Sequence, residues 1–239
     1  MNTAFPMPED YREAGRLQRE LAAQVVVNGD PGNVRLLAAL DASHKRGGNL
    51  VAAAVLWDCR QNRLCEIGLA HVDPDTVFPY VPGYLSFREA PAYLAALDQL
   101  SQKPELLLVD GQGIAHPRRL GIASHLGVYL DLPSIGVAKR PLVGKAAGDL
   151  EAEAGSAVPL THKGEAIGWV YRSRTGVKPL YLSPGHRVGL DETLALVRAL
   201  PTRTKLPEPL RQAHYWAGKA RQENIHGRIT ITPPLFDVD

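Results

Sequence analysis

Hydrophobic residues recur along the chain at two spacings, which separate the predicted helices from the predicted strands. Near the N-terminus they lie three or four positions apart, which predicts an amphipathic helix over residues 9–25. Its apolar stripe consists of Tyr11, Ala14, Leu17, Leu21 and Val25. Three apolar runs follow at 35–43, 49–57 and 64–72, joined by short connections that contain Gly, Asn and Asp. Such runs predict a meander of three antiparallel strands.

The rest of the chain alternates between short apolar runs and helical patterns. A Pro-rich loop at 78–83 precedes a predicted helix, and the apolar strand ELLLVD at 105–110 is closed by Gly111. The last predicted helix, near 207–222, has Pro207 in its first turn, where proline is favoured. The other predicted helices are 87–101, 118–130 and 189–200, and the other predicted strands are 133–138, 166–172 and 178–182.

This order of elements predicts an α/β fold. Three antiparallel strands, then a helix, a strand, a helix and a strand, follow the order of a ribonuclease H-like mixed sheet, with added parallel strands and flanking helices. Because no repeat or linker interrupts the pattern, we expect a single domain over residues 1–225. Residues 226–239 contain two prolines and lack periodicity, so we expect a loose or extended tail there.

The composition is typical of a packed globular protein. Hydrophobic residues make up 45% and charged residues 22% of the 239 positions, which excludes a disordered chain. No apolar run reaches the roughly 18 residues of a membrane-spanning helix, and the first residues do not resemble a secretion signal. The two cysteines, Cys59 and Cys65, are too few for a disulfide framework. We therefore expect a cytoplasmic monomer with no membrane partner.

The net charge of +2 is unevenly distributed along the chain. Residues 111–145 contain five basic residues and one acidic residue, so their net charge is +4. Residues 186–222 contain seven basic and three acidic residues, and their net charge is also +4. Residues 1–34 contain three basic and five acidic residues, so their net charge is −2. Clustered cations fit a phosphate-binding face. Because the loops of ordinary proteins are often as basic, charge alone leaves a nucleic-acid partner undecided.

Three carboxylates occupy positions that need an explanation. Asp41 lies inside an apolar strand with no Arg or Lys beside it, and an unpaired buried charge is heavily penalised. Asp110 ends the ELLLVD strand, at the edge where ligands of open sheets gather, although Asp before Gly is also an ordinary turn signal. Glu89 completes an S-x-x-E capping box with Ser86, yet helical spacing places it on the same inward face as Tyr93.

Together these carboxylates favour a metal site. If their strands are neighbours, Asp41 and Asp110 converge, and Glu89 points over them from the helix between. Oxygen-only clusters of this kind suit Mg²⁺ or Mn²⁺ rather than zinc. Without a cation, converging carboxylates would repel and raise one another's pKa. Such an ion stabilises charge on a phosphodiester and helps to generate hydroxide near neutral pH.

Five segments resemble the endonuclease V family and follow the family's order. They are FPYVPGYLSFREAP at 78–91, DGQGIAHPRRLGIASHLG at 110–127, IGVAK at 135–139, SPGH at 183–186 and LPEPLRQAH at 206–214. The resemblance covers about residues 10–222. It implies a ribonuclease H-like, Mg²⁺-dependent nuclease that repairs double- or single-stranded DNA with deaminated bases, chiefly deoxyinosine. It also implies a cut at the second phosphodiester bond 3′ to the lesion, leaving 3′-hydroxyl and 5′-phosphate ends.

The resemblance assigns the residues of catalysis. They are Asp41, Glu89, Asp110, His214 and Lys139, of which the three carboxylates are also the implied metal ligands. Lys139 matches a basic residue near the scissile phosphate, and His214 is placed near the attacking water or the metal. A lone histidine on a terminal helix is also commonly structural. Leu210 stands where the family usually has Thr, which leaves the setting of His214 open.

The resemblance also implies a wedge that separates the DNA strands. Its residues are Pro79, Tyr80, Val81 and Pro82, with Val81 in place of the usual Ile. Two prolines stiffen this loop, and the Tyr80 ring can fill the space that a flipped base leaves. Extruding a base costs about a few kcal/mol, and less for a poorly paired base such as hypoxanthine. Without the resemblance, the same segment also fits a stiff surface turn.

Glycines and arginines complete the implied DNA-binding set. Gly83, Gly111 and Gly113 suit a pocket in which the backbone approaches a flat base closely, although each is also an ordinary turn residue. Arg118 and Arg119 are candidates for phosphate contacts, which position nucleic acid without reading its sequence.

We therefore expect a deoxyinosine 3′ endonuclease that uses Mg²⁺, with Mn²⁺ as a substitute. An inosine-specific endoribonuclease is one alternative, because the sequence does not show how a ribose 2′-hydroxyl would be received. A non-catalytic lesion-binding protein on the same fold is another. Three carboxylates beside a phosphate disfavour that second alternative, because a binder gains nothing from negative charge there.

Overall fold

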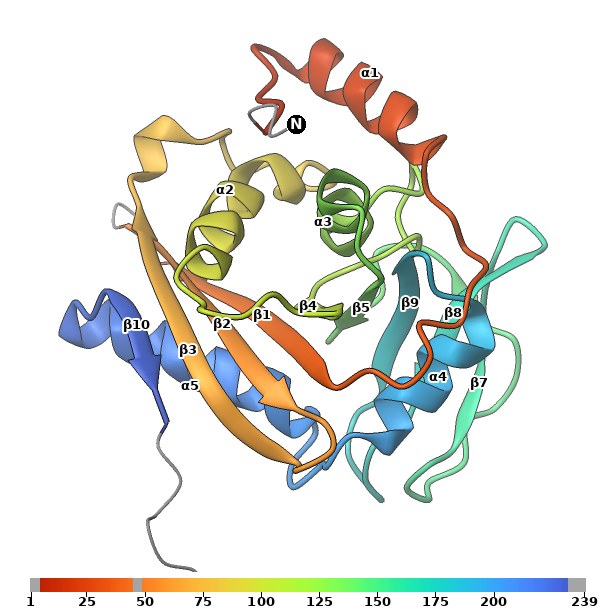
Figure 1. Cartoon of the computed structure of the whole chain (residues 1–239). Coiled ribbons are helices and arrows are strands. Elements are labelled where there is room, and N and C mark those ends of the chain that lie inside the picture. Colours follow the sequence, from red (N-terminus) through yellow and green to blue (C-terminus); the bar gives the residue numbers. More distant parts are fainter. Residues whose placement is uncertain (1–4, 45–48, 232–239) are drawn as a thin grey trace, which may run out of the picture.

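A ten-stranded mixed sheet forms the centre of the computed structural model, which describes residues 5–44 and 49–231 (Figure 1). The strand order is β10-β3-β2-β1-β4-β5-β9-β8-β7-β6. The strands are β1 Leu36–His44, β2 Leu50–Asp58, β3 Arg63–Val72, β4 Leu106–Asp110, β5 Ser134–Ala138, β6 Lys145–Ala146, β7 Ala157–His162, β8 Glu165–Tyr171, β9 Leu180–His186 and β10 Gly227–Thr230. β1, β4 and β5 run parallel, and the other neighbours are antiparallel.

Helices cover both faces of the sheet (Figure 1). α2 and α3 pack on one face through apolar side chains such as Tyr93 and Leu126. α4 and α5 pack on the other face, where Leu194 and Leu210 join the core. The helices are α1 Tyr11–Ala22, α2 Leu85–Leu97, α3 Ile122–Leu130, α4 Leu190–Ala199 and α5 Glu208–Glu223, with a short 3-10 turn at Pro74–Thr76. The predicted mixed sheet with flanking helices is confirmed. Among the described residues, no helix has the length and apolarity needed to cross a bilayer.

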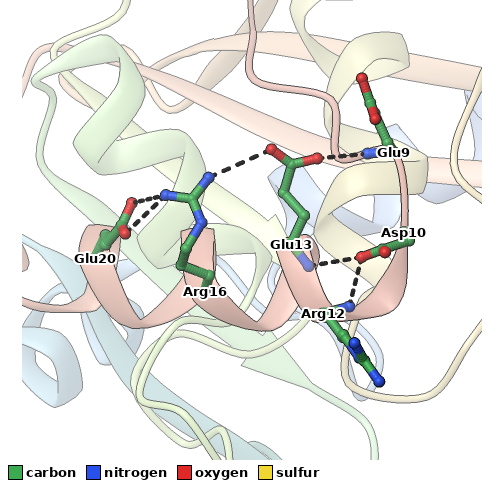
Figure 2. A network of polar contacts seen from close by, with 6 residues as sticks. All are labelled: Glu9, Asp10, Arg12, Glu13, Arg16 and Glu20. Carbon is green, nitrogen blue, oxygen red and sulfur yellow. Dashed lines mark hydrogen bonds and ion pairs between the residues drawn. The ribbon is translucent and has the colours of Figure 1, made fainter.

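The outer face of α1 carries a chain of exposed polar contacts (Figure 2). The Asp10 carboxylate caps the helix by accepting the backbone N–H groups of Arg12 and Glu13, each at 2.8 Å. The Arg16 guanidinium lies 3.3 Å from a Glu13 oxygen and 2.8 Å from a Glu20 oxygen. Exposed pairs of this spacing contribute only about 0.3–0.5 kcal/mol each. Packing of the inner face therefore holds α1 in place.

That inner face differs from the predicted one. Tyr11, assigned to the apolar stripe, is 52% exposed, whereas Ala14, Gly15 and Gln18 are buried. The predicted stripe was right at Ala14 and wrong at Tyr11, and it left out Gly15 and Gln18. The periodicity of apolar residues did not include the polar Gln18, which has a hydrogen-bonding partner elsewhere in the fold.

Several boundaries also differ from the predictions. α3 begins at Ile122 rather than 118, since Arg119 has a φ of 58°, outside the helical region. β6 and β7 were missed, because neither is a continuous apolar run. In the predicted tail, Gly227–Thr230 forms β10, which pairs with β3 at the edge of the sheet. Residues 232–239 lie outside the described residues, and the division into a domain at 1–225 and a tail stays a prediction.

Candidate active site

Two neighbouring parallel strands place two aspartates at the same edge of the sheet. Leu40 pairs with Val109 in the register of β1 and β4, so the next residues, Asp41 and Asp110, leave the paired region side by side. Asp41 is only 6% exposed. The side chains of Asp41, Asp110 and His214 each offer one candidate metal-ligating atom, and these three atoms all lie within 4.8 Å of one another. The fold therefore joins residues that are far apart in the sequence, as predicted for the two aspartates.

His214 reaches this cluster from α5. Its Nδ1 lies 2.6 Å from Oδ2 of Asp41, and this hydrogen bond is the main reason that the pKa of His214 is raised. The neighbouring Ala213 is buried against the sheet, while the His214 side chain is 64% exposed. The helix thus anchors the histidine on its buried side and presents the imidazole to solvent beside the two aspartates. Leu210, the departure from the family pattern, is a buried core residue one turn earlier.

Glu89 approaches the aspartates from α2. Its side chain is buried, and the Tyr93 hydroxyl donates a hydrogen bond to Oε2 at 3.4 Å, so the predicted shared face is confirmed. Burial, and then the charges of Asp41 and Asp110, raise the pKa of Glu89 to about 8. The capping box was wrong, because α2 begins at Leu85 and the Ser86 hydroxyl bonds His125 Nδ1 at 3.0 Å instead. Glu89 is therefore free to face inward.

Lys139, just after β5, contacts the carboxylate of Asp110. Burial and the nearby Asp41 raise the pKa of Asp110 to about 6, although the positive charge of Lys139 acts in the opposite direction. The pKa values of Glu89 and Asp110 are raised mainly by burial, and repulsion between the neighbouring carboxylates raises them further. A divalent cation suits this arrangement, because carboxylate oxygens and an imidazole nitrogen are available to it.

The candidate ligands differ slightly from the predicted set. Asp41, Asp110 and Glu89 were expected to bind the metal. Within the described ranges, the three residues whose candidate metal-ligating atoms lie within 4.8 Å of one another are Asp41, Asp110 and His214, so His214 takes the place expected for Glu89. Glu89 lies close enough for Asp41 and Asp110 to shift its pKa but outside that group. Its part in metal binding stays a prediction.

A cavity of about 380 Å³ opens beside this cluster. Its lining includes Asp110, Gly111 and Lys139 together with the 80–83 loop. Tyr80, at the centre of the predicted wedge, is 62% exposed. A large aromatic ring on a proline-flanked loop therefore stands at the mouth of a hollow next to the carboxylates. Pro79 and Pro82 flank this ring, as the sequence requires.

Three side chains hold the end of this loop. The Gly83 carbonyl accepts hydrogen bonds from Gln18 Nε2 at 3.0 Å, Arg118 Nη2 at 2.7 Å and His116 Nε2 at 3.1 Å. We call these three donors the Gly83 clamp. Gly83 itself has a φ of 82°, which glycine adopts without strain. The Arg118 guanidinium also lies over the Tyr84 ring, 4.3 Å from its centre.

The clamp gives Arg118 a role within the protein, and Arg119 also has one. Arg119 Nη2 lies 3.0 Å from a carboxylate oxygen of Glu165, and Nη1 lies 3.3 Å from His162 Nδ1. The phosphate contacts of both arginines stay predictions. The sequence analysis missed Gln18. The signal that could have found it is its position one helical turn after Ala14, on the same face of the predicted helix.

Gly113 and Gly111 have packing reasons to lack a side chain. A Cβ on Gly113 would lie 2.0 Å from the carbonyl oxygen of Pro184 in β9, and its N–H donates to the Ser183 hydroxyl at 2.8 Å. A Cβ on Gly111 would meet only the Ile122 side chain, at 2.5 Å. Gly111 borders the cavity, whereas Gly113 is buried behind it. Their contacts with a base stay predictions.

Comparison with known proteins identifies this arrangement. Residues 19–215 match the endonuclease V family. The chain belongs to that family. Endonuclease V of Thermus thermophilus is 61% identical over 217 residues, which are 90% of this chain and 96% of that protein. The predicted membership and an endonuclease activity are therefore confirmed.

Solved endonuclease V structures share the fold. The Streptomyces avermitilis endonuclease V has a TM-score of 0.84 at 39% identity, over 92% of this chain and 96% of that chain. The Ciona intestinalis endonuclease V, in complex with a 24mer DNA containing an inosine followed by a ribo-adenosine, has a TM-score of 0.76 at 25% identity. That match covers 91% of this chain and 100% of the Ciona chain.

Proposed function

We propose that this endonuclease V cuts DNA at deaminated bases, chiefly deoxyinosine, with Mg²⁺ as its natural metal and Mn²⁺ as a substitute. The cut falls at the second phosphodiester bond 3′ to the lesion and leaves 3′-hydroxyl and 5′-phosphate ends. The observation that supports this most is the meeting of Asp41, Asp110 and His214 at the rim of the cavity beside Tyr80. The inosine-containing DNA bound to the Ciona relative supports the same substrate.

Each residue of the site has a task in this proposal. Asp41 and Asp110 would hold the divalent cation, which would neutralise charge on the phosphate and acidify water. The hydrogen bond from Nδ1 to Asp41 fixes the His214 ring and leaves Nε2 to take a proton from the attacking water. Lys139 draws the phosphate toward Asp110. The Tyr80 loop parts the strands, and the altered base enters the cavity.

A cleavage assay tests this proposal. A labelled duplex with a single deoxyinosine is incubated with the protein and Mg²⁺, Mn²⁺ or a chelator. We expect cleavage with either metal, none with the chelator, and a 5′-phosphate product that maps to the second bond 3′ to deoxyinosine. An undamaged duplex is the control. A metal-independent cut, or a cut at another bond, would contradict the proposal, and faster cleavage of an inosine-containing RNA would favour the endoribonuclease alternative.

The Gly83 clamp leads to a prediction about this activity. In Gln18→Ala the Gly83 carbonyl loses one of three donors, and Arg118 loses the Gln18 oxygen that its Nε contacts. A lost hydrogen bond of this kind costs about 1 kcal/mol, so we expect kcat/KM on a deoxyinosine duplex to fall about fivefold, mainly through KM. Glu20→Ala, on the exposed face of α1, is the matched control. Equal kinetics of the two variants would show that the clamp does not position the loop.

A further inference from the structure

A second hollow adjoins the aspartate cluster at His214, and we call it the basic groove. Its volume is about 730 Å³. The basic side chains along it belong to Lys139, Arg140, Lys178, Lys205, Arg211 and His214. Within the described part of the chain, its lining contains no carboxylate. The groove thus differs in charge from the cavity beside Tyr80, which Asp110 borders.

Not all of these cations are engaged within the protein. Arg211 is paired with Glu208, at 2.5 Å and 2.7 Å, and Lys139 contacts Asp110. Lys178, Lys205 and Arg140 form no side-chain ion pair with any residue in 5–44 or 49–231. The groove therefore presents three uncompensated positive charges to whatever occupies it.

The positive charges are close enough to affect one another. Burial lowers the pKa of Lys205, and the neighbouring charges of Lys139 and Lys178 lower it further, whereas the more weakly acting Asp110 raises it. Like charges held this close repel, and an anion between them removes the repulsion. The groove is therefore complementary to a chain of negative groups rather than to a neutral or cationic segment.

The basic groove continues from the cavity beside Tyr80. Lys139, Arg140 and Pro141 border both hollows. Asp110 borders the cavity, and His214 borders the groove. Because these two residues belong to the metal-binding cluster, the cluster lies where the hollows meet. A strand with one nucleotide in the cavity can therefore pass the cluster and continue directly into the groove.

We propose that the basic groove binds the backbone phosphates of the cut strand on the 3′ side of the scissile bond, through Lys178 and Lys205. This inference rests on the proposed function, because the position of the cut sets the direction of the strand. The lesion lies 5′ of the cut and occupies the cavity, so the nucleotides beyond the cluster are those on the 3′ side. Lysine ammonium groups bind such phosphates without regard to base sequence.

The test measures cleavage of deoxyinosine strands that extend one, four or ten nucleotides beyond the cut. For the unchanged protein we expect KM to fall as this 3′ extension lengthens, and for Lys178→Ala/Lys205→Ala we expect that dependence to disappear. The slope of log(kcat/KM) against log salt concentration should become shallower by about 1 for each lysine removed. Lys103→Ala/Lys163→Ala, which removes two exposed lysines outside the groove, is the matched control. Lengthening the strand on its 5′ side should affect both variants as it affects the unchanged protein.

A binding measurement separates the two proposals. Fluorescence anisotropy in the presence of a chelator reports strand binding whether or not cleavage occurs. We expect the groove variant to bind 3′-extended strands about tenfold more weakly than the control variant. If the groove variant cuts deoxyinosine with an unchanged 3′-length dependence, or binds 3′-extended strands as tightly as the control, the groove is not the strand's path. Failure of every protein to cut deoxyinosine would instead overturn the proposed function alone, because the anisotropy comparison still decides the groove.

Discussion

Asp110→Asn is expected to reduce Mg²⁺-supported cleavage of a deoxyinosine duplex by about 10²- to 10³-fold, which is the usual cost of losing a group that stabilises charge in the transition state. The change removes one of the two carboxylates that would hold the cation and leaves Lys139 without its partner. Binding of the duplex in the presence of a chelator should change little, because the Tyr80 loop and the basic groove are intact. Gel-based cleavage rates and anisotropy provide the two measurements.

The same variant has a signature that does not depend on activity. Burial and Asp41 already raise the pKa of Asp110 to about 6, so the metal-free protein keeps this charge at a cost in stability. Asp110→Asn removes the repulsion, and the Tm of the metal-free variant should equal or exceed that of the unchanged protein. The rise in Tm that Mg²⁺ produces by binding the folded state should be lost. Asp149→Asn, at an exposed position, is the control. An unchanged Mg²⁺ effect in Asp110→Asn would exclude Asp110 as a ligand.

Gly113→Ala should be the most destabilising single methyl addition near the site. The new Cβ would lie 2.0 Å from the Pro184 oxygen and 2.8 Å from the Ser183 oxygen, and neither backbone atom can move without disturbing β9. Overpacking a core commonly costs about 1–3 kcal/mol, and a clash with backbone belongs at the upper end of that range. We therefore expect the free energy of unfolding in urea to fall by about 3 kcal/mol.

Two other glycines provide comparisons for Gly113→Ala. Gly148→Ala should be neutral or slightly stabilising, since nothing lies within 4 Å of its Cβ and the substitution restricts the unfolded chain. Gly111→Ala should lie between the two, because only the Ile122 side chain has to move. If Gly113→Ala is as stable as Gly148→Ala, the close approach of the 111–113 segment to β9 is not a constraint on the fold.

The spacing of apolar residues predicted the strands whose own sequence favours a strand, and missed those that depend on a pairing partner. The first three strands were found within one residue of their bounds because each is rich in apolar residues and is bounded by short connections. β7 was missed because AVPLTH contains a proline and only one fully buried residue. Pairing of β10 with β3 was also missed, since a four-residue strand at a sheet edge is stabilised by its partner rather than by its own sequence.

The candidate site likewise contains residues that the sequence predicts and residues that only the fold brings together. Asp41 could be predicted because a charge inside an apolar strand is anomalous, and Asp110 because it ends a strand at the edge where ligands of open sheets gather. The Gly83 clamp could not be predicted, because Gln18 and Gly83 are 65 residues apart and no spacing relates them. The choice of His214 rather than Glu89 as the third neighbour likewise depends on how α5 and α2 lie on opposite faces of the sheet.

The hydrogen bond between His214 and Asp41 joins residues that are 173 positions apart. During translation, the ribosome therefore releases β1 long before it makes the helix that supplies the histidine. A nascent chain has its aspartates but no complete catalytic centre until α5 has emerged and docked. If His214 acts as proposed, the catalytic centre is therefore completed by one of the last elements of the chain to be made, and only once that helix has docked on the sheet.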